Sequence, residues 1–201
     1  MNEEKIVTLT TWLEGKALTG AIITDFHSIA YLSGFESDPI ERVLALVLFS
    51  GKPPFLFGPA LEVNSMKESG WRFQAFGYED HENPWEKLVT HIKDATSGQS
   101  FALEADNLSI SRYHALQSAY PSASFNSDIT DQINHLRLIK TPAEIKHMVA
   151  AGHDADRAFD IGFRTLTEGI SELAVAAKIE YVLKKAGVPA MRFDILLQFG
   201  D

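Results

Sequence analysis

The sequence predicts an α/β protein: a mixed β-sheet flanked by helices over residues 1–130, followed by a mostly helical stretch over residues 131–201. Two observations predict this class. Apolar runs typical of strands alternate with segments of helical spacing throughout residues 1–130, as in a sheet covered by helices. After residue 130, long amphipathic segments replace this alternation. We therefore expect one α/β domain, a boundary near residues 128–140, and the beginning of a second domain.

The amino-terminal part predicts a helix, a strand and a hairpin. Apolar side chains recur at helical spacing over residues 4–18, and Gly20 breaks the pattern before the apolar run 21–23. A longer apolar run, residues 43–49, ends at the turn-forming segment 50–54, and residues 55–57 are apolar again. We expect the last two runs to pair as a hairpin of buried strands.

The middle of the chain alternates between the two kinds of element. In order, we expect a helix over residues 60–68, a strand over 71–76, a helix over 84–93, a strand over 101–104, a helix over 109–118 and a short strand at 124–125. This alternation favours a mixed sheet with helices on its faces.

The second part carries a clear helix start at Thr141-Pro142-Ala143-Glu144. Threonine at the N-cap, proline at the first helical position and glutamate at the third form a capping box, which predicts a long helix to about residue 165. A second helix is expected to end at Gly187, and residues 191–199 predict a strand. Two helices and one unpaired strand do not make a domain, so we expect residues 131–201 to be an incomplete one.

Charge and composition narrow the functional classes. The formal net charge is -9, and no cluster of basic residues offsets it, so nucleic acid is not an expected partner. No apolar run approaches the roughly 20 residues that span a bilayer, and the acidic first residues do not resemble a signal peptide. The chain contains no cysteine, which excludes disulfides and thiolate metal sites. We expect a cytoplasmic protein without a membrane partner.

The residues alone assign neither a catalytic group nor a metal ligand. No two of the seven histidines lie three or four residues apart on an expected helix, and no Gly-x-Ser-x-Gly motif supports a nucleophilic serine. One loop stands out: the charged segment 36–42, which contains Pro39 and separates an expected buried helix from the strand at 43–49. The residues alone favour a connecting loop in which Glu41 and Arg42 form a local salt bridge, with a functional loop as the alternative.

Several motifs together resemble a known family. Tyr31-Leu32-Ser33-Gly34-Phe35, followed by Asp38-Pro39-x-Glu41-Arg42, is similar to the N-terminal domain of bacterial Xaa-Pro dipeptidases, the prolidases. The segment 136–145 resembles the linker and first catalytic-domain helix of that family, Gly169-x-Ser171-Glu172 its next helix start, and residues 193–201 its first catalytic strand. The resemblance implies a creatinase-type, ribonuclease H-like N-terminal domain over residues 1–130 and the start of an α+β pita-bread domain over residues 131–201.

The resemblance implies a metal-dependent hydrolase of Xaa-Pro dipeptides that uses two divalent ions, such as manganese, cobalt or zinc. In the family, the metal ligands all lie beyond the strand at which this chain stops, and Asp194 and Asp201 match non-ligand positions. We therefore expect no catalytic residue, no metal ligand and no bound metal in these 201 residues, and no activity from them alone.

The resemblance also implies substrate-binding candidates. Phe193 and Leu196 match apolar positions that help line the pocket for the residue before proline, although both also fit a buried strand. In the family's homodimers, the loop that matches residues 36–42 reaches toward the partner's active site, which makes Asp38, Glu41 and Arg42 candidates for shaping substrate choice. Ile40 departs from the family pattern, because related lactic-acid-bacterial enzymes carry histidine there, and isoleucine cannot titrate.

Alternatives remain on the same fold. Aminopeptidase P removes a residue from longer peptides and creatinase hydrolyses a guanidino compound, but Asp38-Pro39-x-Glu41-Arg42 favours the dipeptidase. The alternative from another class is a non-catalytic module for binding or dimerisation. The residues that would decide between these functions lie beyond position 201.

Overall fold

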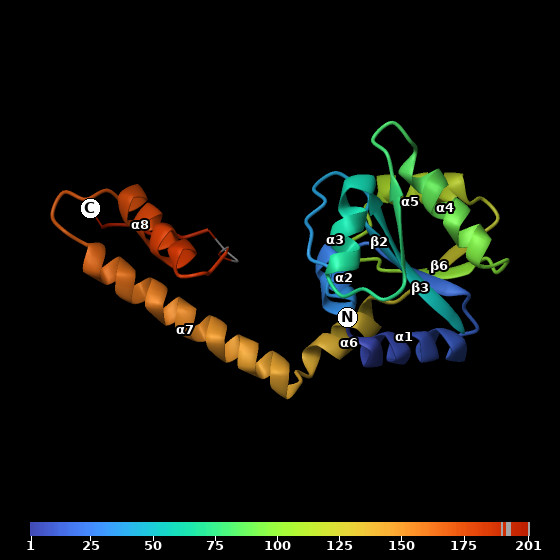
Figure 1. The fold of residues 1–201 in the computed structure, drawn as a ribbon, viewed down its shortest axis with the longest axis horizontal. Coiled ribbons are helices and arrows are strands. Elements are labelled where there is room, and N and C mark those ends of the chain that lie inside the picture. Colours follow the sequence, from blue (N-terminus) through green and yellow to red (C-terminus); the bar gives the residue numbers. More distant parts are fainter. Residues whose placement is uncertain (190, 192–193, 201) are drawn as a thin grey trace. The chain divides into compact units, whose positions relative to one another are not determined.

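The computed structural model describes residues 1–189, 191 and 194–200 and divides the chain into two compact units. The first unit covers Met1–Leu138, and the second begins at Ile139 (Figure 1). Within the described residues, no helix is long and apolar enough to cross a membrane.

In the described part of the chain, six strands form one mixed sheet in the order β4-β3-β2-β1-β5-β6. β1 pairs antiparallel with β2 and β2 antiparallel with β3, whereas the β3–β4, β1–β5 and β5–β6 pairs are parallel. The strands are β1 (Gly20–Ile23), β2 (Ala45–Phe49), β3 (Lys52–Pro59), β4 (Gln74–Tyr78), β5 (Ser100–Leu103) and β6 (Ser124–Asp128). The predicted fold class and the predicted hairpin of β2 and β3 are therefore confirmed.

Helices cover both faces of this sheet (Figure 1). They are α1 (Glu3–Gly15), α2 (Phe26–Ser33), the 3-10 turn η1 (Ala60–Glu62), α3 (Val63–Glu68), α4 (Pro84–Ala95), α5 (Ile110–Ala119) and α6 (Thr130–Leu138). Side chains alternate between the faces of a strand, and β2 shows this directly. Leu46 and Leu48 belong to the apolar cluster under α1, α2, α3 and α6, whereas Val47 and Phe49 belong to the cluster under α4 and α5.

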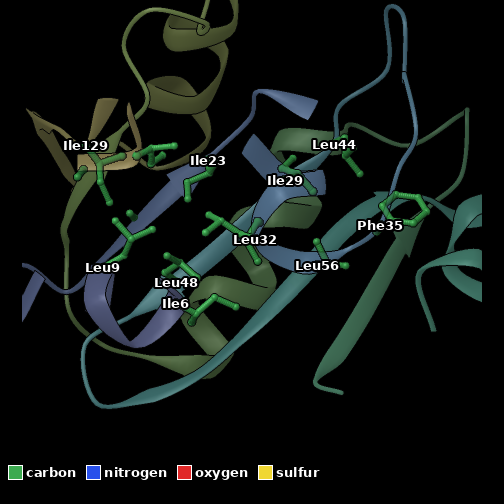
Figure 2. Close-up of a cluster of buried hydrophobic side chains, with 14 of the residues drawn as sticks. Ile6, Leu9, Ile23, Ile29, Leu32, Phe35, Leu44, Leu48, Leu56 and Ile129 are labelled. Carbon is green, nitrogen blue, oxygen red and sulfur yellow. The ribbon is translucent and has the colours of Figure 1, made fainter. Parts of the chain in front are cut away.

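The cluster under α1, α2, α3 and α6 is shown in Figure 2. Leu9 from α1 and Leu32 from α2 pack there with Ile23 and Leu48 from the central strands. Each of these side chains is buried, and full burial of such a side chain contributes about 1.5–3 kcal/mol. Apolar runs in the central strands thus have partners on both faces of the sheet, which explains why their sequence is almost continuously hydrophobic.

The second unit contains α7 (Pro142–Thr165) and α8 (Glu172–Lys185). The predicted capping box is confirmed: Glu144 N donates to Thr141 Oγ1 at 3.2 Å, and Thr141 N donates to Glu144 Oε2 at 2.7 Å. Gly162 allows the two helices to approach, because a Cβ at this position would lie 3.3 Å from Ile179 Cδ1. Val175, Ile179 and Leu183 form the apolar centre of this unit.

The strand predicted over residues 191–199 is wrong for the residues described there, 191 and 194–199, which have no strand structure. Ile195 and Leu197 pack against the core of the second unit, whereas Leu196 between them is exposed. This alternation is that of an extended segment. A strand also needs a ladder partner, and no described residue pairs with this segment.

Candidate functional site

The most distinctive surface segment is the loop between α2 and β2, which we call the 36–42 loop because residues 36–42 are exposed or half-buried. It starts at Gly34, the αL C-cap of α2, with a φ of 81°. A Cβ at Gly34 would also lie 2.9 Å from Met1 N, so both the backbone conformation and the close contact require glycine. Phe35 is buried and fixes the start of the loop in the core.

The tip of the loop is a turn closed by its own atoms. Ile40 N donates to Asp38 Oδ1 at 3.0 Å, and Arg42 N donates to Pro39 O at 2.9 Å. Ile40 has a φ of 57°, a conformation that β-branched residues rarely adopt, and its side chain is 82% exposed. The tip therefore presents an apolar side chain to solvent between two carboxylates, Asp38 and Glu41.

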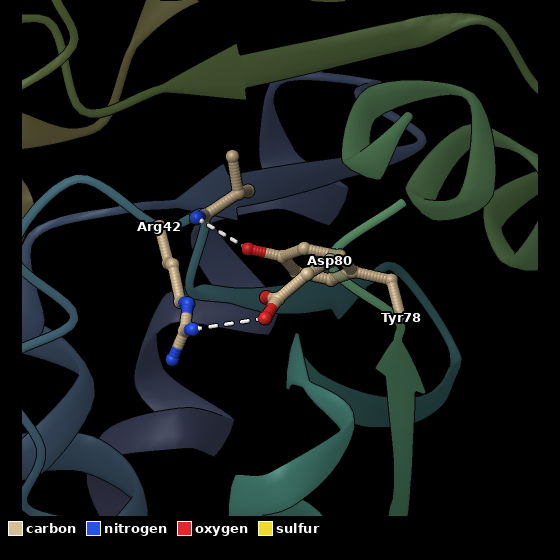
Figure 3. Close-up of polar contacts among 4 residues, drawn as sticks. Arg42, Tyr78 and Asp80 are labelled. Carbon is tan, nitrogen blue, oxygen red and sulfur yellow. Dashed lines mark hydrogen bonds and ion pairs between the residues drawn. The ribbon is translucent and has the colours of Figure 1, made fainter. Parts of the chain in front are cut away.

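Arg42 pairs with a residue from another element. Its Nη2 lies 3.1 Å from Asp80 Oδ2, just after the end of β4 (Figure 3). The local salt bridge expected between Glu41 and Arg42 is therefore wrong, because the fold brings the end of β4 to the guanidinium. The neighbouring Tyr78 hydroxyl accepts a hydrogen bond from Val43 N at 2.8 Å (Figure 3).

Arg112, on α5, contacts the same segment from a third element. Its Nη2 donates to Glu41 O at 3.0 Å and to Arg42 O at 3.3 Å. The sequence did not single out Arg112, and nothing in the spacing of residues 41 and 112 points to this contact. Together with the contacts that Asp80 and Tyr78 make, these bonds connect the base of the loop to both β4 and α5.

The hydroxyl of Tyr78 is held in its neutral form. Burial raises the pKa of Tyr78 above its ordinary value of 10.0, and this outweighs the hydrogen bond from Val43 N and the charges of Arg42 and Arg112, which lower it. The hydroxyl therefore keeps its proton near neutral pH and accepts from the buried Val43 amide with a lone pair.

A second polar group lies where the parallel strands β1 and β5 end. The buried Glu104 accepts from Ser28 Oγ at 2.6 Å and from Asp25 N at 3.3 Å. Burial raises the pKa of Glu104, and the charge of Asp25 adds to this, whereas the hydrogen bonds lower it in part. The sequence did carry a signal for this pair, since Asp25 follows the expected strand 21–23 by two residues and Glu104 is the last residue of the expected strand 101–104.

These carboxylates do not make a metal centre. Within residues 1–189, 191 and 194–200, no three histidine, aspartate or glutamate side chains gather so that they could hold a metal ion. Asp25 also caps α2 by accepting from Ser28 N at 3.1 Å, so its carboxylate already has a structural role. The pair of metal ions that the family resemblance implies thus finds no ligand set among these residues, and we derive no reaction step through it.

An apolar cavity of about 320 Å³ lies beside β6 and α5, lined in part by Leu108, Tyr113 and Phe125. One oxygen of Asp128 at its rim accepts from Thr130 N at 2.8 Å and from Ala105 N at 3.3 Å. The first bond lies at the start of α6, and the second connects Asp128 to the segment after β5. Most of the cavity's lining is apolar, so it offers few polar groups for orienting a reactant.

The predicted site residues separate into two groups. Asp38, Glu41 and Arg42 lie together in the 36–42 loop of the first unit. Leu196 belongs to the second unit and is 85% exposed, and Phe193 lies outside the described residues.

Comparisons with known proteins agree on one family. Residues 5–139 match the family described as "Creatinase/Prolidase N-terminal domain". The chain is 40% identical over 202 aligned residues to the Xaa-Pro dipeptidase of Lactobacillus helveticus, and the alignment covers 100% of this chain and 54% of that protein. The chain thus spans about half the length of the curated relatives it matches.

Solved structures of Xaa-Pro dipeptidases are also similar to this chain. The N-terminal domain of the Xaa-Pro dipeptidase from Lactobacillus brevis is 41% identical, with a TM-score of 0.62 over 65% of this chain and 98% of that one. The Xaa-Pro dipeptidase from Bacillus anthracis has a TM-score of 0.76 over 92% of this chain and 49% of that one, and its 22% identity shows a shared fold alone. The chain therefore belongs to the creatinase/prolidase family, and residues 5–139 are its N-terminal domain.

Proposed function

We propose that this chain is the amino-terminal part of a cytoplasmic, metal-dependent peptidase that hydrolyses Xaa-Pro dipeptides. The observation that carries the proposal is the 40% identity to a protein named Xaa-Pro dipeptidase along the whole length of the chain. The bond before proline is a tertiary amide without an N–H group, so its hydrolysis calls for a dedicated recognition surface.

In this proposal the 36–42 loop contributes to substrate choice. Asp38 and Glu41 are exposed at its tip, whereas the charge of Arg42 is directed to Asp80. The tip therefore presents negative charge, which attracts the ammonium group of a free amino terminus. The loop acts on the active site of a second subunit in a homodimer, and Phe193 and Leu196 line the pocket for the residue before proline.

Proline release from dipeptides tests the proposal. The protein expressed from its complete gene is supplied with manganese or cobalt and assayed on Leu-Pro and on the tripeptide Leu-Pro-Gly, with the 201-residue chain in parallel. We expect hydrolysis of Leu-Pro by the complete protein and none by the 201-residue chain. Removal of leucine from the tripeptide, with Leu-Pro left intact, would assign the aminopeptidase P activity instead. A complete protein that binds no metal and cleaves neither peptide would be a binding or dimerisation module.

A further inference from the structure

The base of the 36–42 loop is fixed by side chains from two other elements. Arg112, from α5, donates to Glu41 O and Arg42 O, and Tyr78, from β4, accepts from Val43 N. Residues 41, 42 and 43 thus each have a backbone group that is hydrogen-bonded to a side chain far away in the sequence. All three precede Ala45, where the pairing of β2 begins. A surface loop usually leaves such groups to water, so this arrangement restricts the loop much more than its own turn does.

The strained residue lies directly beside these contacts. Ile40 holds a φ of 57° although its side chain is 82% exposed, so no burial of the side chain compensates the backbone conformation. Strained conformations persist where the surrounding structure determines them, and they gather at functional sites. The contacts that Arg112 makes with residues 41 and 42 provide such a constraint.

We propose that Arg112 is a positioning residue that holds the 36–42 loop in one conformation and presents Asp38, Ile40 and Glu41 as a preformed recognition surface. The surface is negative, because Asp80 offsets the charge of Arg42 and the two carboxylates of Asp38 and Glu41 exceed the single charge of Arg112, which is bound to backbone carbonyls at the base. A rigid surface loses less conformational entropy on binding than a mobile one, so holding the loop raises both affinity and discrimination.

The effect of Arg112 on substrate choice rests on the proposed peptidase function, whereas its effect on the loop does not. A negative loop tip favours a dipeptide with a cationic first residue over one with an anionic first residue. Arg112 acts through the loop, so it alters this discrimination and the KM values, and it leaves the chemical step to other residues.

Limited trypsin digestion of the 201-residue chain tests the effect on the loop. Cleavage after Arg42 is followed by mass spectrometry for the wild type, Arg112→Ala and Arg112→Lys. The control is Arg72→Ala, which removes another exposed arginine that pairs with a carboxylate, Glu3, at 2.6 Å. We expect cleavage at Arg42 to be about ten-fold faster in Arg112→Ala, equivalent to about 1.4 kcal/mol, intermediate in Arg112→Lys and unchanged in Arg72→Ala.

A thermal melt of each variant separates local loosening from global unfolding. If Arg112→Ala does not fold, the cleavage rate of Arg112→Lys still tests whether Arg112 holds the loop. This variant keeps the charge but loses the planar group that reaches both carbonyls. Equal cleavage rates at Arg42 in the wild type and in every folded Arg112 variant would overturn the proposal.

Selectivity of the complete protein tests the effect on substrate choice. We expect Arg112→Lys, which keeps the positive charge, to bring the ratio of kcat/KM values for Arg-Pro and Asp-Pro closer to one by raising the KM for Arg-Pro, with kcat nearly unchanged. Arg72→Ala is expected to keep the wild-type ratio. An unchanged ratio in Arg112→Lys would overturn the role in selectivity. A wild-type protein that hydrolyses no Xaa-Pro dipeptide would instead refute the proposed function, and the digestion result would still decide whether Arg112 holds the loop.

Discussion

Ser28 and Glu104 join the first turn of α2 to the end of β5 through a hydrogen bond of 2.6 Å between Ser28 Oγ and Glu104 Oε1. The two residues are far apart in the sequence and meet because β1 and β5 run parallel, which brings the segments after both strands to the same edge of the sheet. The contact buries a carboxylate, and its ionisation therefore affects the stability of the first unit.

Replacement of Glu104 by glutamine is expected to change how stability depends on pH. Burial raises the pKa of Glu104 above 4.5, so the folded state binds this proton more tightly than the unfolded state does. The stabilising contribution is complete below pH 4.5 and is lost as the pH rises through the raised pKa. In urea unfolding, the wild type should lose stability relative to Glu104→Gln over that range. A stability difference that stays constant with pH would show that Glu104 does not titrate in this way.

The imidazole of His91 is expected to make stability depend on pH in the opposite direction. It stacks on Phe76 with ring centroids 3.9 Å apart, and burial lowers its pKa below 6.5 despite the nearby charge of Asp94, which raises it. Stability from the neutral ring is present above pH 6.5 and is lost as the pH falls through the lowered pKa. His91→Phe keeps a stacked ring and should remove this dependence. NMR titration of the wild-type ring checks the direction directly, and a midpoint above 6.5 would refute it.

Relief of backbone strain at Ile40 is expected to stabilise the first unit. Asparagine tolerates a positive φ better than isoleucine does, and little buried surface is lost because the side chain is exposed. Ile40→Asn should therefore raise the free energy of unfolding by about 1 kcal/mol. Ile110→Asn is the control, since Ile110 is also exposed, at 75%, but lies in helix α5. No difference between the two variants would mean that Ile40 is not strained in solution.

Loss of the Tyr78 hydroxyl is expected to destabilise the first unit. Tyr78→Phe keeps the buried ring but leaves the Val43 amide without its acceptor, at a cost of about 1–3 kcal/mol. Tyr113→Phe, which changes a half-buried tyrosine on α5, should cost less than about 0.5 kcal/mol. Chemical denaturation of both variants measures the difference, and equal values would argue against the bond to Val43.

The sequence predicted those parts of the fold that depend on local patterns. The apolar runs 43–49 and 55–57 pair as β2 and β3, and Thr141 with Glu144 forms the expected capping box, because the periodicity or the spacing itself contains the signal. The strand expected over residues 191–199 is absent from the residues described there, 191 and 194–199, because a strand depends on a partner, which composition does not reveal.

The candidate site was predicted less completely for a similar reason. The 36–42 loop could be recognised from its charge and proline, but the partner of Arg42 could not. Glu41 is adjacent in sequence, yet the end of β4 brings Asp80 to the guanidinium of Arg42. Arg112, on α5, also binds this segment, through Glu41 O. Such contacts depend on how the sheet is ordered, which the sequence pattern left open.

We proposed that these residues work as the amino-terminal part of a larger peptidase, and the intact mass of the protein expressed from its native gene distinguishes this from the alternatives. We expect a mass well above the 22.3 kDa of this chain, since the chain covers 54% of the Xaa-Pro dipeptidase it resembles. A native mass of 22.3 kDa would refute the proposed function and favour a binding or dimerisation module.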